Sequence, residues 1–389
     1  MKFLNKKYLK SYRTVDSLKL IHSGEEYFDT LKEIINKARK TIHLQVYIFS
    51  DDVVGRKVAA LLKSAAERGV EVFVIVDTIG SFSLPDSFIE DLKKTGIHFR
   101  FFHPLISSSG FHFGRRMHHK VVTVDGEFAL VGGINIAERY MSSENAPAWL
   151  DFAVLIKGDM VRGISDICER LWKRKFTRNV LVKQGRSLLN SDTDKTLVRV
   201  RENDWMRKKF AISKSYKQSF NRAENYITIV GAYFMPSLRL RHLIKKAAKR
   251  GVKVRVILSQ FSDARIFRKA SIYLYSWLLR QGVEVYEYKK SVVHAKIAVV
   301  DDIWTTIGSH DLNFLSTYGL IEMNIDILDK NFTASFNHEL EGIMQNDCIQ
   351  ILKDDYSKNK SLIEKITEWL AYQAMRFSLW TLVFITSKK

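Results

Sequence analysis

HHKVVTVD at residues 118–125 and HAKIAVVD at residues 294–301 follow one pattern, His-x-Lys-x-x-x-x-Asp. Each copy is followed at the same interval by paired small residues, Gly132-Gly133 in the first case and Gly308-Ser309 in the second. With this composition, one such pattern is expected by chance about 0.1 times per chain. Two copies with matching small residues therefore indicate a site built from two similar halves.

The spacing inside each motif is that of a β-strand that presents its histidine and its lysine together. Residues i and i+2 of a strand point to the same face, and Val, Ile and Thr, which favour strands, surround both motifs. We therefore expect His118 and Lys120 to project to one side, with His119 turned away. His294 and Lys296 should project together in the second copy.

Asp125 and Asp301 close the two motifs. Asp125 precedes Gly126, and Asp-Gly between apolar runs predicts a hairpin turn. The aspartates then lie beyond the His/Lys pairs, so we interpret them as organisers of the site more than as direct participants. The returning strand, EFALVGG, carries glycines that permit close backbone approach to a ligand, and Asn135 can donate an amide N–H to an oxyanion.

The repeat extends well beyond the motifs. AAERGVEVFVIVD at 65–77 matches AAKRGVKVRVILS at 247–259, and TIHLQVYIF at 41–49 matches YITIVGAYF at 226–234. Strands and helices alternate in each half, which predicts an α/β fold of two pseudo-symmetric domains, each a mixed sheet flanked by helices. Two tandem domains that merely share ancestry are the alternative, but the duplicated His/Lys pairs favour one active site at the domain interface.

With these motifs the chain resembles the phospholipase D superfamily, whose hallmark is two His-Lys-Asp motifs. Within that superfamily it looks most like the bacterial cardiolipin synthases. The likeness spans Ser23 to Gln350 and includes the segments SGEEYFDTL, IHLQVYIFSDD, GGINIAERY and AYFMPS. The paired motifs are highly specific for the superfamily, whereas the surrounding segments are moderately specific for the lipid synthases.

The resemblance implies a phosphatidyl transfer in two steps through a phosphohistidine, without a metal. The family pattern makes His118 the nucleophile and His294 the acid/base, although pseudo-symmetry makes this order hard to derive from the sequence. Imidazole can serve in both roles near neutral pH. Lys120, Lys296 and Asn135 would stabilise the charge on the non-bridging phosphate oxygens.

A carboxylate on the next strand of each half is expected to orient a histidine. These residues are Asp151, in AWLDFAVLIKG, and Glu322, in TYGLIEMNIDIL. Acidic residues at these places orient the histidines in related enzymes, and an ordinary solvent-facing strand charge is the alternative. Both lie among apolar neighbours, which favours the functional interpretation.

The second motif departs from the family pattern Gly-Ser-x-Asn, because it reads Gly308-Ser309-His310-Asp311. An ionised Asp311 that faces a phosphate would repel it. Either Asp311 is protonated, or it pairs with a lysine, or it turns away and Ser309 binds the phosphate.

Composition limits the partners and cofactors. The net charge of +20 and the pI near 9.7 require an anionic partner, and anionic lipid, nucleic acid and a polyphosphate all fit. No Rossmann or P-loop glycine pattern appears, so no nucleotide cofactor is expected. Histidines cluster around the first motif, but no Cys/His spacing supports a metal site. These histidines are His98, His103, His112 and His119. The sequence does not indicate an oligomeric state.

The two ends of the chain suggest an anionic phospholipid membrane as partner. The C-terminus, WLAYQAMRFSLWTLVFITSKK, is interrupted by Arg376, and the remaining apolar run is too short to span a bilayer. We expect an interfacial helix with Trp369, Trp380 and Phe384 in lipid; a helix docked on the protein's own core is the alternative. The cysteines, Cys168 and Cys348, fit a reducing compartment, so we expect a peripheral protein on the cytoplasmic face of the cell membrane.

The predicted organisation has five parts. They are a basic N-terminal segment (1–20), a first phospholipase D-like domain (21–182), a linker (183–195), a second such domain (196–352) and a C-terminal membrane-interfacial helical segment (353–389).

Three functions remain open at this point. The leading prediction is a phosphatidyltransferase that makes cardiolipin from phosphatidylglycerol and a second lipid. A hydrolytic phospholipase D and a phospholipase D-type nuclease use the same His/Lys pairs. The concentration of aromatic and basic residues at the termini argues against a nucleic acid partner. The acceptor alcohol, whether phosphatidylglycerol, phosphatidylethanolamine or water, does not follow from the sequence.

Overall fold

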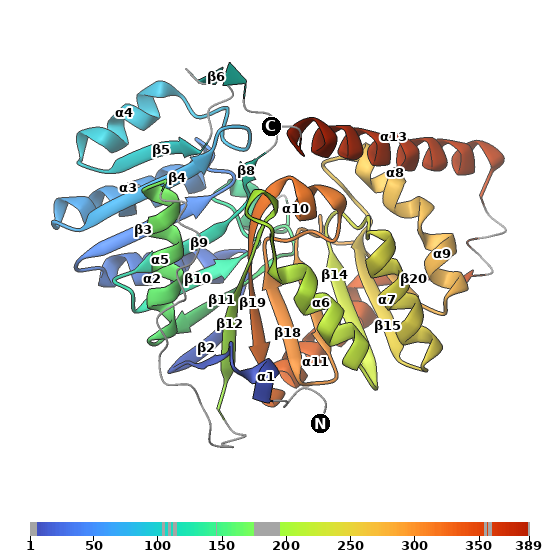
Figure 1. The fold of residues 1–389 in the computed structure, drawn as a ribbon. Helices are drawn as coiled ribbons and strands as arrows, with labels where there is room; N and C mark the ends of the chain where they lie inside the picture. Colours follow the sequence, from blue (N-terminus) through green and yellow to red (C-terminus); the bar gives the residue numbers. More distant parts are fainter. Residues whose placement is uncertain are drawn as a thin grey trace.

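The computed structural model describes residues 6–102, 106–107, 110–111, 115–144, 146–174, 195–353, 356 and 360–387. These residues form two halves that lie side by side, each a sheet with helices on both of its faces (Figure 1). The predicted α/β fold of two pseudo-symmetric halves is thus confirmed. Most of the segment 183–195, expected to be the linker, lies outside the described residues.

The two sheets repeat one strand order. The first sheet runs β2-β11-β10-β9-β3-β4-β5, and the second contains β12-β19-β18-β17-β14-β15-β16 in the same succession. In each sheet the last three strands are parallel, and they meet the His-x-Lys strand in an antiparallel pair. The strands of the first sheet are β2 (Ser17–His22), β3 (Thr41–Val46), β4 (Glu71–Asp77), β5 (His98–Phe102), β9 (Lys120–Val124), β10 (Phe128–Gly132) and β11 (Phe152–Lys157). Those of the second are β12 (Leu197–Asp204), β14 (Tyr226–Gly231), β15 (Lys253–Ser259), β16 (Glu284–Tyr288), β17 (Lys296–Val300), β18 (Trp304–Gly308) and β19 (Leu320–Leu328), with β1 (Arg13–Thr14) and β20 (Cys348–Ile351) beyond them.

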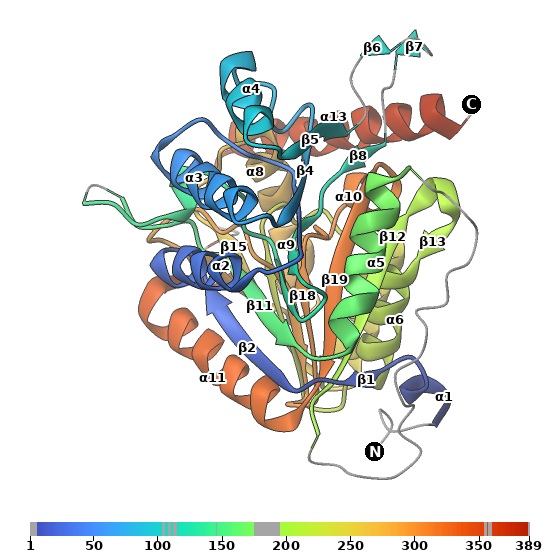
Figure 2. The same ribbon diagram turned by 90° about the vertical axis from the view of Figure 1, so that its left-hand side faces the viewer.

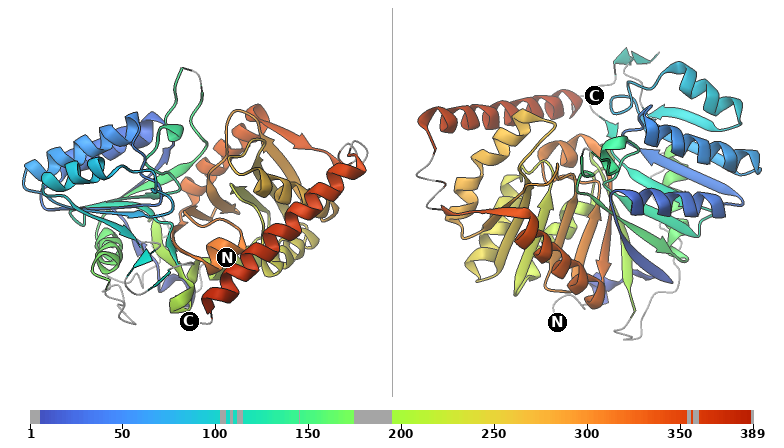
Figure 3. Two further views of the ribbon diagram at one scale, coloured as in Figure 1. Left: turned by 90° about the horizontal axis from the view of Figure 1, so that it is seen from above. Right: turned by 180° about the vertical axis from the view of Figure 1, so that it is seen from behind.

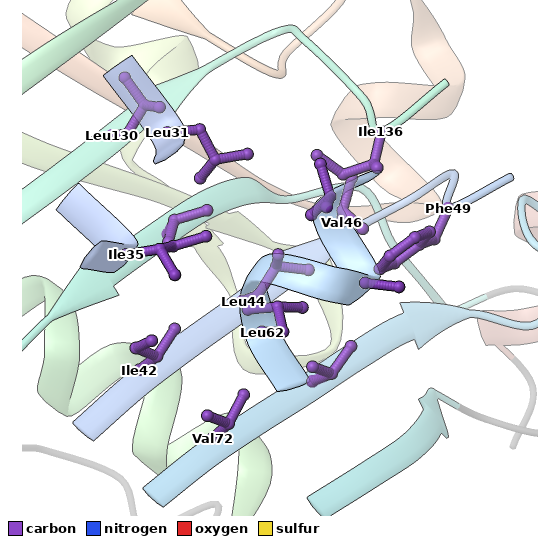
Figure 4. Packing of buried hydrophobic residues seen from close by; sticks show 14 of the residues in the cluster. Leu31, Ile35, Ile42, Leu44, Val46, Phe49, Leu62, Val72, Leu130 and Ile136 are labelled. Carbon is purple, nitrogen blue, oxygen red and sulfur yellow. The ribbon is translucent and has the colours of Figure 1, made fainter. Parts of the chain in front are cut away.

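Apolar helix faces cover one side of the first sheet. Leu31 and Ile35 of α2 and Leu62 of α3 are fully buried against Ile42 and Leu44 of β3 (Figure 4). Their spacing along each helix follows the helical period, so one stripe faces the strands. The helices of this half are α2 (Glu25–Lys37), α3 (Val53–Glu67), α4 (Asp86–Lys94) and, on the opposite face, α5 (Met160–Trp172).

The two halves share one hydrophobic core. Val131 and Phe152 of the first sheet belong to the same buried cluster as Val299 and Met323 of the second. The rings of Phe152 and Phe336 lie 5.1 Å apart across this boundary. A shared core fixes the two sheets relative to each other, which a site assembled from both halves requires.

The helices of the second half follow the repeat, with additions. They are α6 (Ala211–Arg222), α7 (Leu238–Lys249), α8 (Arg265–Tyr273), α9 (Tyr275–Arg280), α10 (Phe314–Tyr318) and α11 (Lys330–Asp347). Figure 2, which views the molecule from the side of the first half, shows α11 and α6 on opposite faces of the second sheet.

The N-terminal segment joins the halves. After α1 (Lys6–Leu9), β1 pairs with β12 of the second half, whereas β2 pairs with β11 of the first. Strand β2 begins at Ser17, inside the segment 1–20 that we expected to precede the first domain. The N-terminal segment is therefore part of the folded structure from Lys6 onward.

The C-terminal helix α13 (Leu362–Ser387) lies along the second half, beside α8 and α10 (Figure 3). Ala371, Tyr372 and Met375 are buried in a cluster with Met235 and Leu274. Side chains on the other face of its first half are exposed, with Leu362 at 73% and Ile363 at 74%. The structure thus shows the docked alternative for one face of the helix, and contact of the exposed face with lipid stays a prediction. Within the described residues, no helix is long and apolar enough to cross a membrane.

Candidate active site

Each motif histidine lies just before its strand and contacts a carboxylate of the other half. Nδ1 of His118 is 3.0 and 3.1 Å from the two carboxylate oxygens of Glu322, on β19. Nδ1 of His294 is 2.7 Å from Oδ2 of Asp151, which directly precedes β11. All four side chains are buried. The two His/Lys pairs therefore belong to one site at the interface of the halves.

Backbone hydrogen bonds reinforce this exchange between the halves. The N–H of His118 donates to the carbonyl of Ile321, at 2.9 Å, and the N–H of His294 donates to the carbonyl of Leu150, at 2.8 Å. Ile321 and Leu150 are the residues that precede Glu322 and Asp151. Each histidine is thus fixed at its main chain and at its ring by one dipeptide of the opposite half.

Burial sets the protonation of the site. It lowers the pKa of both His118 and His294 well below the usual value, and the charges of Lys120 and Lys296 act in the same direction. Burial also raises the pKa of the Asp151 and Glu322 carboxyl groups to about 7. A neutral imidazole that donates Nδ1–H to a carboxylate leaves the Nε2 lone pair available as nucleophile or base.

The two lysines are buried beside the histidines. Nζ of Lys120 donates to the carbonyl of His118 at 2.9 Å, and Nζ of Lys296 donates to the carbonyl of His294. Burial lowers the pKa of Lys120 to about 7, so an anion placed beside this group would favour its charged form.

Asp311 pairs with a lysine. One of its carboxylate oxygens is 3.7 Å from Nζ of Lys296, and its side chain is buried. Burial raises the pKa of Asp311. Of the three alternatives considered for this departure from the family pattern, the structure shows the ion pair with lysine.

The two groups predicted to bind phosphate are hydrogen-bonded to protein atoms. The amide of Asn135 accepts the N–H of Ile48, at 3.1 Å, and donates to the hydroxyl of Tyr140, at 2.8 Å. The hydroxyl of Ser309 donates to Glu322. Both side chains thus hold neighbouring residues of the site in place. Direct phosphate binding by them stays a prediction.

The motif aspartates lie at the opposite ends of their strands from the histidines. The carboxylate of Asp125 accepts the N–H groups of Arg39, Lys40 and Thr41, at 2.7 to 2.8 Å. Asp301 accepts those of residues 224–226 in the same way. Both residues have positive φ, as the predicted turn requires. They tie the His-x-Lys strand to the start of its neighbour and do not touch the histidines.

The paired small residues serve close contact between strands. A Cβ atom on Gly133 would lie 2.4 Å from a carboxylate oxygen of Asp151, and one on Gly308 would lie 2.3 Å from the carbonyl of Met323. In the structure these residues admit the strand that carries the carboxylate, and close approach of a ligand to them stays a prediction. Ser309, which replaces the second glycine, hydrogen-bonds the equivalent carboxylate, that of Glu322.

Aromatic rings that the sequence analysis did not assign to the site flank both histidines. The ring of Tyr47 lies edge-on to His118, at 4.9 Å between centroids, and the ring of Tyr140 lies edge-on to His294, at 5.3 Å. Tyr47 lies within TIHLQVYIF, a segment of the internal repeat, which was the available signal. Tyr140 ends GGINIAERY, one of the segments that carry the family resemblance, which was the available signal there.

No group of three or more potential metal ligands is found among the described residues. His119 turns away from the site, as expected, and its Nδ1 is 3.1 Å from the side-chain oxygen of Gln45. His103 and His112 lie outside the described residues.

The chain is similar to known proteins over most of its length. The family described as "Cardiolipin synthase, PLD-like domain" matches residues 31–172 and 216–344. Cardiolipin synthase B of Escherichia coli K12 is 32% identical over 371 residues, which cover 92% of this chain and 86% of that protein. A minor cardiolipin synthase of Bacillus subtilis is 27% identical, over 93% of this chain and 90% of that protein.

Two solved structures share the fold at low sequence identity. Phosphatidylserine synthase of Haemophilus influenzae superposes with a TM-score of 0.73 at 14% identity, and the match covers 96% of both chains. Polyphosphate kinase of Porphyromonas gingivalis gives a TM-score of 0.60 at 14% identity, over 95% of this chain and 54% of that one.

Proposed function

Since the chain belongs to the cardiolipin synthase family of phospholipase D-like enzymes, we propose that it transfers a phosphatidyl group between alcohols through a phosphohistidine. The donor is phosphatidylglycerol or a similar phospholipid, and the acceptor is an alcohol of a second lipid. The observation that carries the proposal is the pair of buried histidines, each held at Nδ1 by a carboxylate of the opposite half. Two equivalent Nε2 atoms in one site fit a reaction with two opposite in-line steps.

In the first step, Nε2 of His118 attacks the phosphorus and forms a P–N bond. The bond from phosphorus to the departing headgroup oxygen breaks, and His294 delivers the proton that this oxygen needs. In the free site, burial and then the positive charges of Lys296 and Lys120 lower the pKa of His294. The phosphodiester anion offsets these positive charges. Substrate binding therefore favours the protonated His294 that the step requires, with Asp151 as its counter-ion.

In the second step, His294 removes the proton of the acceptor hydroxyl. The acceptor oxygen attacks the phosphorus, the P–N bond to His118 breaks, and the site returns to its starting protonation state. Lys120 and Lys296 stabilise the charge on the non-bridging oxygens in both steps. Water at the acceptor position would give phosphatidic acid instead, which is the hydrolytic alternative.

The exposed face of α13 fits the surface of an anionic phospholipid membrane. Ile363, Trp369 and Leu370 are all at least 45% exposed, and an apolar helix face beside basic residues favours the lipid interface. The buried face of α13 packs on Met235 and α10. The N–H of Met235 donates to the carbonyl of Leu312, the residue after Asp311, at 3.1 Å. We place the protein on the cell membrane as a peripheral protein, on the cytoplasmic face.

Liposomes that contain phosphatidylglycerol and phosphatidylethanolamine test this proposal. The purified protein should produce cardiolipin, with glycerol released when phosphatidylglycerol is the donor, and mass spectrometry identifies both products. A matched His118→Ala protein serves as the inactive control. Phosphatidic acid as the sole product would show a hydrolase, and no turnover of either lipid would contradict the proposal.

A further inference from the structure

The residues that end β4 and β15 hold the peptides that lead into the catalytic histidines. Oδ2 of Asp77, the last residue of β4, accepts the N–H of Met117 at 2.9 Å. Oγ of Ser259, the last residue of β15, accepts the N–H of Val293 at 2.9 Å. Met117 and Val293 immediately precede His118 and His294. The same hydrogen bond, from the peptide before a histidine to the side chain that ends a strand, therefore occurs in both halves.

The internal repeat supports this equivalence. Asp77 and Ser259 are the final residues of the matching segments AAERGVEVFVIVD and AAKRGVKVRVILS. Both side chains are buried, and neither belongs to a His-x-Lys motif. An aspartate and a serine share only the ability to accept a hydrogen bond at this position.

In the first half, an ion pair with arginine accompanies this hydrogen bond. Oδ1 of Asp77 accepts from Nε and Nη2 of Arg116, at 3.0 and 2.7 Å. Arg116 and Met117 form β8, which pairs in parallel with Leu320 and Ile321 of the other half. The dipeptide before His118 is thus fixed between its own half, through Asp77, and the strand that carries Glu322.

In the second half, the peptide before the histidine is held without an ion pair. Val292 occupies the place of Arg116, and Leu150 forms a parallel bridge with Val293. Ser259 then ties the peptide before His294 to its own half through a neutral hydrogen bond. Each histidine is consequently positioned by both halves at once, and in the first half an ion pair adds to the hydrogen bond.

We propose that Asp77 and Ser259 are positioning residues for His118 and His294, which set each imidazole in line with the phosphorus. The inference rests on the proposed function, because it assigns the residues to the same reaction. Neither residue contacts the histidine ring, so substitution should lower kcat and leave KM for the phospholipid within about twofold. A misplacement of about 1 Å in such a site costs roughly a hundredfold in rate.

The chain itself supplies the rescue variant. Asp77→Ser alone leaves Arg116 buried without its carboxylate and should lower kcat about a hundredfold. The double variant Asp77→Ser, Arg116→Val copies the second half and should recover at least about tenfold of that loss. Ser259→Ala removes one neutral hydrogen bond and should lower kcat about fivefold.

Asp326→Ser is the matched control, because Asp326 forms an equally buried pair with Arg199 in the second sheet, away from the histidines. It should destabilise the fold and leave kcat within about twofold. If Asp77→Ser loses no more kcat than Asp326→Ser, or if the double variant shows no recovery, the positioning role is contradicted. Should Asp77→Ser fail to fold, the double variant and Ser259→Ala decide the question.

Hydrogen exchange separates this inference from the proposed function. The amides of Met117 and His118 should exchange at least about tenfold faster in Asp77→Ser than in the wild type, with residues 296–300 unchanged. This result does not depend on any activity. Wild-type protein without transferase activity would contradict the proposed function alone, whereas unchanged exchange at Met117 and His118 would contradict the positioning role alone.

Discussion

Replacing Glu322 with Gln should slow the reaction and at the same time stabilise the fold. The substitution keeps the shape of the side chain and removes the charge that faces Nδ1 of His118, at 3.0 Å. A hydrogen bond to a charged group contributes about 1.5 to 3 kcal/mol, and a neutral one about 1 kcal/mol. The difference of about 0.5 to 2 kcal/mol corresponds to a loss of kcat between roughly twofold and thirtyfold. An amide that turned its N–H toward Nδ1 would impose the wrong tautomer and cost up to about 10⁴-fold.

Although Glu322→Gln should slow the reaction, it should increase the free energy of unfolding. Burial raises the pKa of Glu322 to about 7, above its value in the unfolded chain, so the ionised carboxylate costs folding free energy once the pH rises through that range. Glu322→Gln removes this cost. Its unfolding temperature should exceed that of the wild type at pH 8, and the difference should shrink toward pH 5. The kcat of the wild type should fall below about pH 7, because the carboxylate becomes protonated.

An activated donor lipid distinguishes the role of Asp151 from that of Glu322. A phosphatidyl ester of p-nitrophenol needs little protonation of its leaving group, so the first step no longer depends on His294 as an acid. The burst of p-nitrophenol should return to near the wild-type rate in Asp151→Asn and stay slow in Glu322→Gln. A Glu322→Gln protein with kcat within twofold of the wild type would refute the reasoning. Recovery of Glu322→Gln instead of Asp151→Asn would exchange the roles of the two histidines.

Three further predictions concern the histidines, metals and the membrane. His118→Ala and His294→Ala should each reduce turnover to background, and the double variant should lose nothing more, because the two residues act as a unit; near wild-type activity in either single variant would exclude the two-histidine mechanism. Chelators should leave activity unchanged, because Lys120 and Lys296 supply the positive charge that a metal would bring; a loss that one added metal restores would contradict this. Ile363→Gln with Trp369→Gln should weaken liposome flotation and leave the unfolding temperature unchanged, since both side chains are exposed. Equal flotation of variant and wild type, at low and high salt, would move the membrane contact away from α13.

The fold followed from the sequence because the repeat and the strand period are local patterns. The duplicated segments predicted two equivalent halves, and Asp-Gly at 125–126 predicted the turn between β9 and β10, where Asp125 has φ of 54°. The expectation that His118 itself lies in the strand was off by two residues, because β9 begins at Lys120. The two residues before His118 pair with strand β19 of the other half.

The exchange of carboxylates could not be read from the sequence. Asp151 and Glu322 each follow the motif of their own half, yet each contacts the histidine of the other. That pairing depends on how the two halves pack against each other, and no periodicity along the chain encodes it. Asp77 was missed for the same reason, because its partner Met117 is 40 residues away in sequence.

For the C-terminal helix, amino-acid composition predicted an apolar helix but not which of its faces is buried. Its aromatic and apolar residues predicted one membrane-facing helix, but the sequence did not show which face is used. Tyr372 and Met375 pack against α8 and the neighbouring Met235, which leaves Leu362, Ile363 and Trp369 exposed. The side chains of Trp380 and Phe384, which we expected to enter lipid, lie outside the described residues.

Trapping the covalent intermediate tests the central claim most directly. His294→Ala protein, given a ³²P-labelled phosphatidyl ester of p-nitrophenol, can complete the first step and lacks the base for the second. The account predicts one label per chain, labile in acid and stable in base, on the peptide that contains His118, and no label in His118→Ala protein. Label on a serine, a lysine or a carboxylate, or no covalent label while p-nitrophenol is released, would contradict it.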